Sequence, residues 1–98
     1  MLGGNTSFMT NYSNGANFER KIKKQYEDDG WFVVRSAGSK GPVDLVAIHV
    51  VDYEIQVDLI QCKTRKPTKS ERDAAIVFVS KYPGVDMYLV WPNGKEHI

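Results

Sequence analysis

The feature that most constrains the fold is a pair of apolar, β-branched runs that together occupy residues 43–63. A polar break at Asp52-Tyr53-Glu54 separates the runs, and this pattern is typical of a β-hairpin. Side chains alternate faces along a strand, so each strand has one more apolar face, which we expect to point at the core. Those faces carry Asp44, Val46, Ile48 and Val50 on the first strand, and Ile55, Val57, Leu59, Gln61 and Lys63 on the second.

The same hairpin brings polar residues together at one end. A tight turn at Asp52-Tyr53 or at Tyr53-Glu54 places Asp44 opposite Gln61 or Lys63, at the rim of the apolar surface. A carboxylate, an amide and an amine then converge where a hairpin needs none of them to fold. Taken alone, polar residues at strand ends are common, because strand ends are solvated. The convergence is a first indication of a site.

The rest of the chain predicts two helices and two more strands. We expect a helix over 18–28 capped by Asn17, a strand over 31–35, and the hairpin after a loop rich in glycine and serine. A second helix over 71–81 follows, with Ser70 as its cap and Asp73 completing a capping box, and then a last strand over 85–91 and a short tail. The order is helix, strand, strand, strand, helix, strand. Residues 1–14 are polar and almost uncharged, so we expect a flexible N-terminal arm before a single domain over 15–98.

Charge and cysteine content exclude several classes of protein. A net charge of +1 over 98 residues excludes a polybasic nucleic-acid binder, although basic residues crowd 20–24 and 63–72 and could form a basic face. The single cysteine, Cys62, excludes an internal disulfide and a cysteine-rich zinc site, and we expect it to be a small packed residue. No secretory signal or apolar run of membrane-spanning length is present. We therefore expect an intracellular protein, from the cytoplasm of a prokaryotic cell or of a virus-infected host cell.

The converging residues suit phosphodiester chemistry. Asp44 and Gln61 offer oxygen ligands, the Cys62 backbone carbonyl could add a third, and Glu19 can approach if the first helix packs over the same face. Hard oxygen ligands suit Mg²⁺ or Mn²⁺, which lower the pKa of bound water. Lys63 could position that water or stabilise charge on the attacked phosphate. Flanking basic residues would hold a DNA backbone, namely Arg20, Arg35, Lys40, Arg65, Lys66 and Lys69. The pattern predicts metal-assisted hydrolysis of a phosphodiester.

Several motifs on these elements resemble a known family. Glu19, Pro42-Val43-Asp44 and Gln61-Cys62-Lys63 together resemble the PD-(D/E)xK nuclease superfamily. More narrowly, the chain resembles the archaeal and viral Holliday junction resolvases, through Phe18-Glu19-Arg20, the run Gly30-Trp31-Phe32-Val33-Val34-Arg35-Ser36, the loop Ala37-Gly38-Ser39 and the run Asp44-Leu45-Val46-Ala47-Ile48. The likeness covers roughly residues 17–65. The nuclease motif alone is loose, whereas the phrase Val-Val-Arg-Ser-Ala-Gly-Ser is much more specific.

The resemblance implies a fold, an activity and a set of roles. The fold is an α/β, restriction-endonuclease-like core, a central mixed β-sheet flanked by helices. The activity is metal-dependent cutting of four-way DNA junctions by a homodimer, each subunit cutting one strand. By position, the resemblance implies that Glu19, Asp44 and Gln61 are metal ligands and that Lys63 is the catalytic lysine. It likewise implies that Ser36 is an active-site serine and that Arg20 and Arg35 contact phosphate.

The sequence departs from the family pattern at two places, and other functions stay open. Val43 separates Pro42 from Asp44, and Gln61 replaces the usual Glu, which removes one negative charge and lowers the expected metal affinity. One alternative is a less selective DNA nuclease built on the same residues. Another is a non-catalytic junction binder whose site has decayed at Gln61. A third is a small dimerising α/β domain with no nucleic-acid role. We place the expected dimer surface on the aromatic-rich last strand and Trp91.

Overall fold

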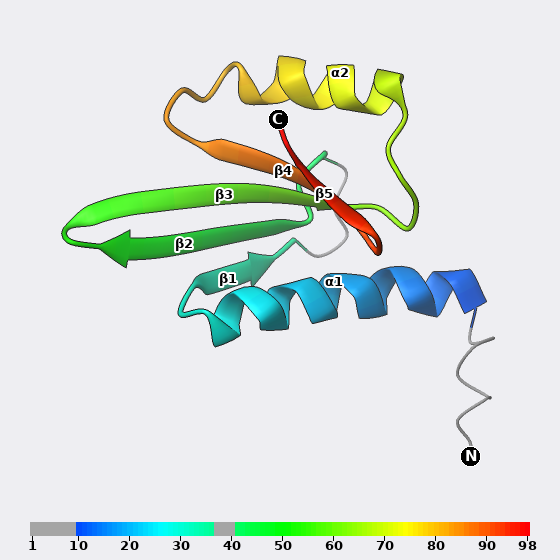
Figure 1. Ribbon diagram of the computed structural model, residues 1–98, viewed down its shortest axis with the longest axis horizontal. Helices are drawn as coiled ribbons and strands as arrows, with labels where there is room; N and C mark the ends of the chain where they lie inside the picture. Colours follow the sequence, from blue (N-terminus) through cyan, green and yellow to red (C-terminus); the bar gives the residue numbers. More distant parts are fainter. Residues whose placement is uncertain (1–9, 37–40) are drawn as a thin grey trace.

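The structure is a computed structural model that describes residues 10–36 and 41–98. Its elements run in the predicted order of helix, strand, strand, strand, helix and strand, with one further strand at the end (Figure 1). They are α1 (Thr10–Asp28), β1 (Phe32–Arg35), β2 (Leu45–Val51), β3 (Glu54–Cys62), α2 (Lys69–Val79), β4 (Asp86–Trp91) and β5 (Gly94–His97). No helix in these two ranges is both long and apolar enough to cross a membrane.

The strands form one mixed five-stranded sheet in the order β1-β2-β3-β4-β5. Every neighbouring pair is antiparallel except β3 and β4, which are parallel because α2 carries the chain back between them. The two helices lie on opposite sides of the sheet, α1 against β1, β2 and β3, and α2 against β4 (Figure 1). The predicted mixed sheet flanked by helices is confirmed.

The hairpin turns at Asp52-Tyr53, the first of the two predicted positions, since Val51 pairs with Glu54. Both turn residues have positive φ, 51° and 67°, as a type I′ turn requires. The register pairs Leu45 with Ile60 and ends there. Asp44, just before β2, donates its N–H to the Ile60 carbonyl and accepts from the Cys62 N–H, so it contacts the residues on either side of Gln61 and not Lys63. The turn therefore sets which polar residues meet at the far end of the hairpin.

The prediction of the core-facing side of the hairpin was wrong. The fully buried residues Leu45, Ala47 and Ile60 lie on the opposite face, where they pack with Ile22 and Val33. That face is less apolar in sequence, yet α1 docks on it. The face predicted to be core is covered by α2 only near β4, where Met87 and Leu89 are buried with Ala75 and packed against Leu59. Toward β1 and the hairpin tip it stays open.

Both helices begin earlier than predicted. α1 starts at Thr10, well before Asn17, so residues 10–14 are helical, and the rest of the predicted arm, residues 1–9, lies outside the described ranges. α2 starts after Thr68, whose side chain accepts a hydrogen bond from the Glu71 N–H while the Glu71 carboxylate accepts one from the Thr68 N–H. The capping box is therefore Thr68–Glu71, and the predicted cap Ser70 lies inside the helix.

The predicted tail is strand β5, which pairs with β4 and covers its outer edge. The strand turns back tightly over Trp91, and Gly94 permits this because a Cβ there would clash with the Trp91 ring. Trp91 is only partly exposed and packs with the α2-side cluster. The last predicted strand is consequently an interior strand, so it is not the exposed surface that we expected to form a dimer.

Candidate active site

Asp44 is fixed by its backbone at the point where three strands meet. Its N–H donates to the Ile60 carbonyl at 2.9 Å, and its carbonyl accepts from the Ser36 N–H at 2.9 Å. Its carboxylate Oδ2 accepts from the Cys62 N–H at 2.8 Å. The residue is thus clamped between the ends of β1 and β3, and Ser36 lies directly beside it, as the sequence predicted for a shared site.

The Asp44 carboxylate is half-buried beside other charged groups. Burial raises its pKa, and the nearby Glu19 carboxylate raises it further, while the Cys62 N–H, Lys63 and Arg35 oppose the rise. Two carboxylates that repel each other at a partly desolvated position favour binding of a cation. The site therefore has the electrostatic character that a metal site requires.

Glu19 reaches this region from α1. It follows Phe18 on the helix stripe that packs against the sheet, and its side chain is only 21% exposed. Its Oε1 accepts from Arg35 Nε at 2.9 Å. α1 packs on the face opposite to the predicted one, yet Glu19 lies near enough to Asp44 to raise its pKa, and Arg35 is the ion-pair partner of Glu19.

Gln61 and Lys63 follow one another on the same face of the end of β3. Gln61 is half-buried and lies between Ile60 and Cys62, the two residues whose backbones bond to Asp44. Lys63 continues the parallel ladder, because its N–H donates to the Val90 carbonyl at 2.8 Å. Its ammonium does not point free into solvent but donates to Glu71 Oε2 at 3.2 Å. The hairpin thus supplies the amide and the amine, and α2 supplies a partner for the amine.

Cys62 points to the other face and packs against the core cluster under α1. Burial, with Asp44 and Glu19 adding to it, raises the pKa of the thiol to about 12. The thiol stays protonated at neutral pH and is a poor nucleophile or metal ligand. Its interpretation as a small packed residue fits this environment, and the role of its backbone carbonyl stays a prediction.

The oxygen donors fit a hard divalent cation, although the acidic set is small. In the described ranges no three His, Cys, Asp or Glu side chains come together in a way that could hold a metal. The site has two carboxylates, Glu19 and Asp44, and the neutral amide of Gln61. Oxygen-only donors of this kind suit Mg²⁺ or Mn²⁺ rather than zinc. A third carboxylate is absent because position 61 is occupied by Gln, whose amide is neutral.

Comparison with known proteins identifies the family. The profile of the archaeal Holliday junction resolvase (Hjc) family matches residues 10–91. The chain belongs to this family. A relative from Methanocaldococcus jannaschii, named crossover junction endodeoxyribonuclease Hjc, is 45% identical over 58 residues, and the match covers 59% of this chain but only 40% of the relative. The structure of Archaeoglobus fulgidus Hjc, a Holliday junction resolvase, aligns with 20% identity and a TM-score of 0.48 over 81% of this chain and 73% of that one.

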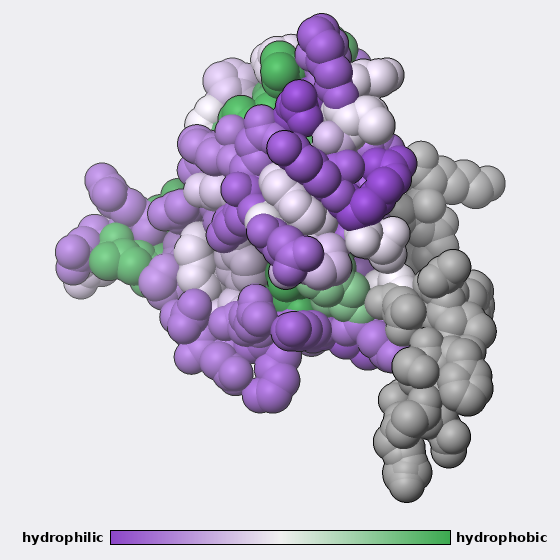
Figure 2. Space-filling model, turned by 45° about the vertical axis from the view of Figure 1, so that its right-hand side comes forward, coloured by the Kyte–Doolittle hydropathy of each residue, from purple (hydrophilic) through white to green (hydrophobic). Residues whose placement is uncertain are grey.

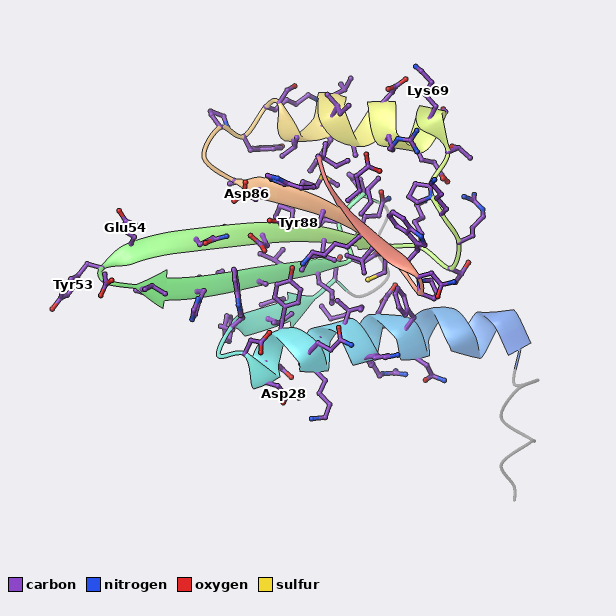
Figure 3. All side chains as sticks on the ribbon, in the orientation of Figure 1. Asp28, Tyr53, Glu54, Lys69, Asp86 and Tyr88 are labelled. Atoms are coloured by element: carbon purple, nitrogen blue, oxygen red, sulfur yellow. The ribbon has the colours of Figure 1, made fainter. Side chains whose placement is uncertain are left out.

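The basic residues predicted to hold DNA have different surroundings in this Hjc-family chain. Arg20 and Lys66 are exposed, and Lys69 is exposed at the start of α2 while it pairs with Asp73 at 2.8 Å (Figure 3). Arg35 is held by Glu19, and Arg65 is held by Glu71. Lys40 lies outside the described residues. Their roles in DNA binding stay predictions, and Arg20 and Lys66 have the most open positions.

The sequence interpretation missed Glu71. This acid contacts Lys63 from α2 although it lies outside the hairpin that carries the nuclease motif of the family. The pattern Thr68-x-x-Glu71 after Pro67 was the available signal, because it matches a capping box better than Ser70 with Asp73. Locating the cap correctly would have placed Glu71 in the first helical turn, near the end of β3.

A hollow of about 360 Å³ lies away from this site, on the α1 face. Among its lining residues are Tyr26, Asp58, Tyr88 and Lys95. Asp58 is buried and accepts a hydrogen bond from the Tyr26 hydroxyl at 3.3 Å, while the Lys95 ammonium lies 4.4 Å from the centre of the Tyr88 ring. Lys95 therefore already occupies the place over the tyrosine ring where a cationic ligand would bind. The side chains that line the hollow join α1 to β5.

Proposed function

We propose that this chain is a metal-dependent, structure-selective endonuclease that cuts four-way (Holliday) DNA junctions by hydrolysing a phosphodiester bond. Its membership of the Hjc family supports this activity. The observation that carries the proposal is the clamp on Asp44, whose backbone and carboxylate contact Ile60 and Cys62 at the end of β3 while Glu19 and Lys63 are close enough to affect its charge.

The proposed roles follow from the chemistry of each side chain. Glu19, Asp44 and the amide oxygen of Gln61, with the Cys62 carbonyl, would hold Mg²⁺, or alternatively Mn²⁺. The bound ion would supply an acidified water and neutralise charge on the phosphate. Lys63 would donate to a phosphate oxygen as negative charge builds up, and the Ser36 hydroxyl would add a hydrogen bond from the end of β1.

DNA contact would depend on phosphates, because the overall charge is close to neutral. Arg20 on α1 and Lys66 after β3 are exposed, and the two segments flank the proposed site. Arg65, Lys69 and Lys40 extend the predicted basic surface. Such contacts position the backbone without reading bases, which fits recognition of junction shape. A DNA substrate of this kind would place the protein inside the cell.

We also propose that two copies act together, one on each of two junction strands. The surface that favours pairing is the open side of the sheet, which we call the open face. Its exposed apolar residues are Phe32 (66%), Val34 (47%), Val50 (59%) and Ile55 (70%). Exposed apolar patches on a protein surface commonly mark interaction sites.

The test is cleavage of a fixed synthetic four-way junction and of a linear duplex with the same sequence, with Mg²⁺ and with a chelator. We expect paired, metal-dependent nicks in the junction. Asp44→Asn and Lys63→Ala should each reduce the cleavage rate at least about 100-fold while junction binding survives, because they remove a ligand and a charge donor. Asp52→Asn and Lys81→Ala, the same changes far from the site, serve as matched controls and should cut normally.

Each other outcome selects a different function. Equal cutting of the linear duplex would indicate a less selective nuclease of the same superfamily. Tight, metal-independent junction binding without any cut would indicate a binder whose site has decayed at Gln61. If the chain binds neither DNA, nucleic acid is excluded as its partner. Wild-type cleavage by both Asp44→Asn and Lys63→Ala would show that another site performs the reaction.

A further inference from the structure

Glu71 receives hydrogen bonds from several sides at the N-terminus of α2. Its Oε2 accepts from Lys63 Nζ at 3.2 Å and from Arg65 Nη2 at 3.2 Å. Its Oε1 accepts from Arg65 Nη1 at 2.9 Å and from the Thr68 N–H at 2.9 Å. One carboxylate thus joins the end of β3, the loop after it and the first turn of α2.

We propose that Glu71 is a positioning residue, which holds the ammonium of Lys63 at the active site. This inference rests on the proposed function, because it gives Lys63 a task in cleavage. It extends the site from the hairpin to α2, an element that carries none of the predicted catalytic or metal-binding residues.

Lys63 needs such a partner because lysine has a long and flexible side chain. Ordering a lysine side chain costs rotamer entropy, so an unpaired amine would spend much of its time away from the phosphate. The pair is also partly withdrawn from water, with side-chain exposures of 24% for Lys63 and 26% for Glu71. Partial burial makes this ion pair stronger than one in open solvent.

Glu71 is itself held rigidly, which a positioning residue requires. It is the third residue of α2, and its N–H donates to Thr68 Oγ1 at 3.2 Å, so both its backbone and its side chain belong to the capping box. Arg65 binds both carboxylate oxygens. Arg65, the Thr68 N–H and Lys63 together hold the pKa of Glu71 well below its usual range. The carboxylate therefore stays charged at neutral pH.

The charge balance of the site gives Glu71 its importance. The residue two positions before Lys63 on the same strand is Gln61, which carries no charge. A Gln can offer an oxygen but cannot pair electrostatically with an ammonium. The acid in hydrogen-bond contact with Lys63 is instead Glu71, and its place in the first turn of a helix is favourable for a negative charge.

The first test is single-turnover cleavage of the four-way junction by Glu71→Gln. Gln at the third helical position keeps the capping box, so the variant removes the charge with little loss of fold. We expect the cleavage rate to fall about tenfold or more, while the Kd for the junction stays the same or tightens as Arg65 is released. Thr68→Ala is the matched control, because it weakens the cap but leaves the Lys63 pair. It should lower Tm and cut within about twofold of the wild-type rate.

The second test does not depend on activity. Reductive methylation with formaldehyde, read by peptide mass spectrometry, measures the access of each lysine amine, with the exposed Lys81 as reference. We expect Lys63 to be modified slowly in the wild type and in Thr68→Ala, and several times faster in Glu71→Gln. Equal modification of Lys63 in all three proteins would overturn the inference.

The two tests separate failure of the inference from failure of the proposed function. If the wild type cuts no DNA but Lys63 is protected by Glu71, the nuclease proposal fails and the ion pair remains. If the wild type cuts junctions and Glu71→Gln cuts at the same rate or faster, the positioning role is wrong while the nuclease proposal stands. Equal slowing by Thr68→Ala and Glu71→Gln would reduce the role of Glu71 to helix capping.

Discussion

At the scale of single residues, Gln61 sets the charge of the proposed metal site. It lies between the two residues of β3 that bond to Asp44, and Glu19 is the other proposed oxygen donor near that carboxylate. With two carboxylates rather than three, the site attracts a divalent cation less strongly, while Asp44 and Glu19 repel each other less. Metal affinity in oxygen sites depends on the number of charged ligands. Position 61 is therefore where a small change should alter the metal requirement most clearly.

We predict that Gln61→Glu lowers the Mg²⁺ concentration for half-maximal junction cleavage by about tenfold, because an added carboxylate strengthens the attraction for the ion. A Mg²⁺ titration of the initial cleavage rate measures this. Gln25→Glu, the same charge change on the exposed surface of α1, is the control and should leave the titration unchanged. A higher Mg²⁺ requirement for Gln61→Glu would mean that position 61 does not face the metal.

The sequence was sufficient for residues whose position depends on local rules. The polar break placed the two-residue turn, which brings Asp44 to the end of β3, and helical spacing brought α1 to the sheet. It was not sufficient for the partners of these residues. The Lys63–Glu71 and Arg35–Glu19 pairs each join two elements, and their contact depends on how those elements dock. Only the folded structure supplies that information.

At the scale of elements, the turn of the β2–β3 hairpin requires a backbone conformation that its residue Tyr53 does not favour. Tyr53 has φ of 67° and is fully exposed, so it adopts a left-handed conformation with no compensating contact from burial (Figure 3). A non-glycine residue in this conformation costs roughly 1–2 kcal/mol. The paired strands of the hairpin thus maintain the register, which brings Asp44 to the end of β3, although the turn itself is unfavourable.

We predict that Tyr53→Gly raises the free energy of unfolding by about 0.5 kcal/mol, since glycine removes the steric cost but loses more chain entropy. Urea unfolding measures this difference. Asp52→Gly should gain less, because aspartate tolerates the left-handed region better than tyrosine. Cleavage should not change in either variant, as the turn lies at the opposite end of the hairpin from Asp44. Destabilisation by Tyr53→Gly would show that the tyrosine ring stabilises the tip.

Element boundaries were predicted less well than element types, for identifiable reasons. Residues 10–17 contain asparagine, serine and glycine, which are poor helix formers, so local propensity argues against the first turns of α1. β5 has only four residues, two of them charged, and resembles a polar tail in sequence. Its backbone pairing with β4, continued by the Ile98 N–H to the Met87 carbonyl at 2.9 Å, makes it a strand.

At the scale of the whole molecule, coverage of the sheet is uneven. One side is covered by α1, whereas α2 covers the other side only over β4, which leaves the open face. The sequence misplaced this surface because both hairpin faces are apolar enough to be buried. Which of them a helix covers depends on docking. The open face is consequently where we expect a second copy to bind.

We predict that the wild-type chain sediments as a dimer at micromolar concentration and that Val34→Glu sediments as a monomer, because a charge at the centre of the open face would be buried unpaired. Val51→Glu is a matched control. Val51 is 52% exposed, close to the 47% of Val34, but it lies on the other side of the sheet. Analytical ultracentrifugation distinguishes the outcomes. Dissociation by Val51→Glu but not by Val34→Glu would place the dimer surface on the other side.

The β2–β3 hairpin also extends beyond the neighbouring strands β1 and β4 (Figure 1). Its projecting end carries apolar residues (Figure 2). In the described part of the chain, β1 pairs with β2 only as far as Ile48, and β4 pairs with β3 only from Asp58. The tip is therefore a two-stranded ribbon with unpaired backbone on both edges, a form that readily recruits strands from other molecules into aggregates. Asp52 and Glu54 at its end give every ribbon the same negative charge, so that two tips repel each other at high protein concentration.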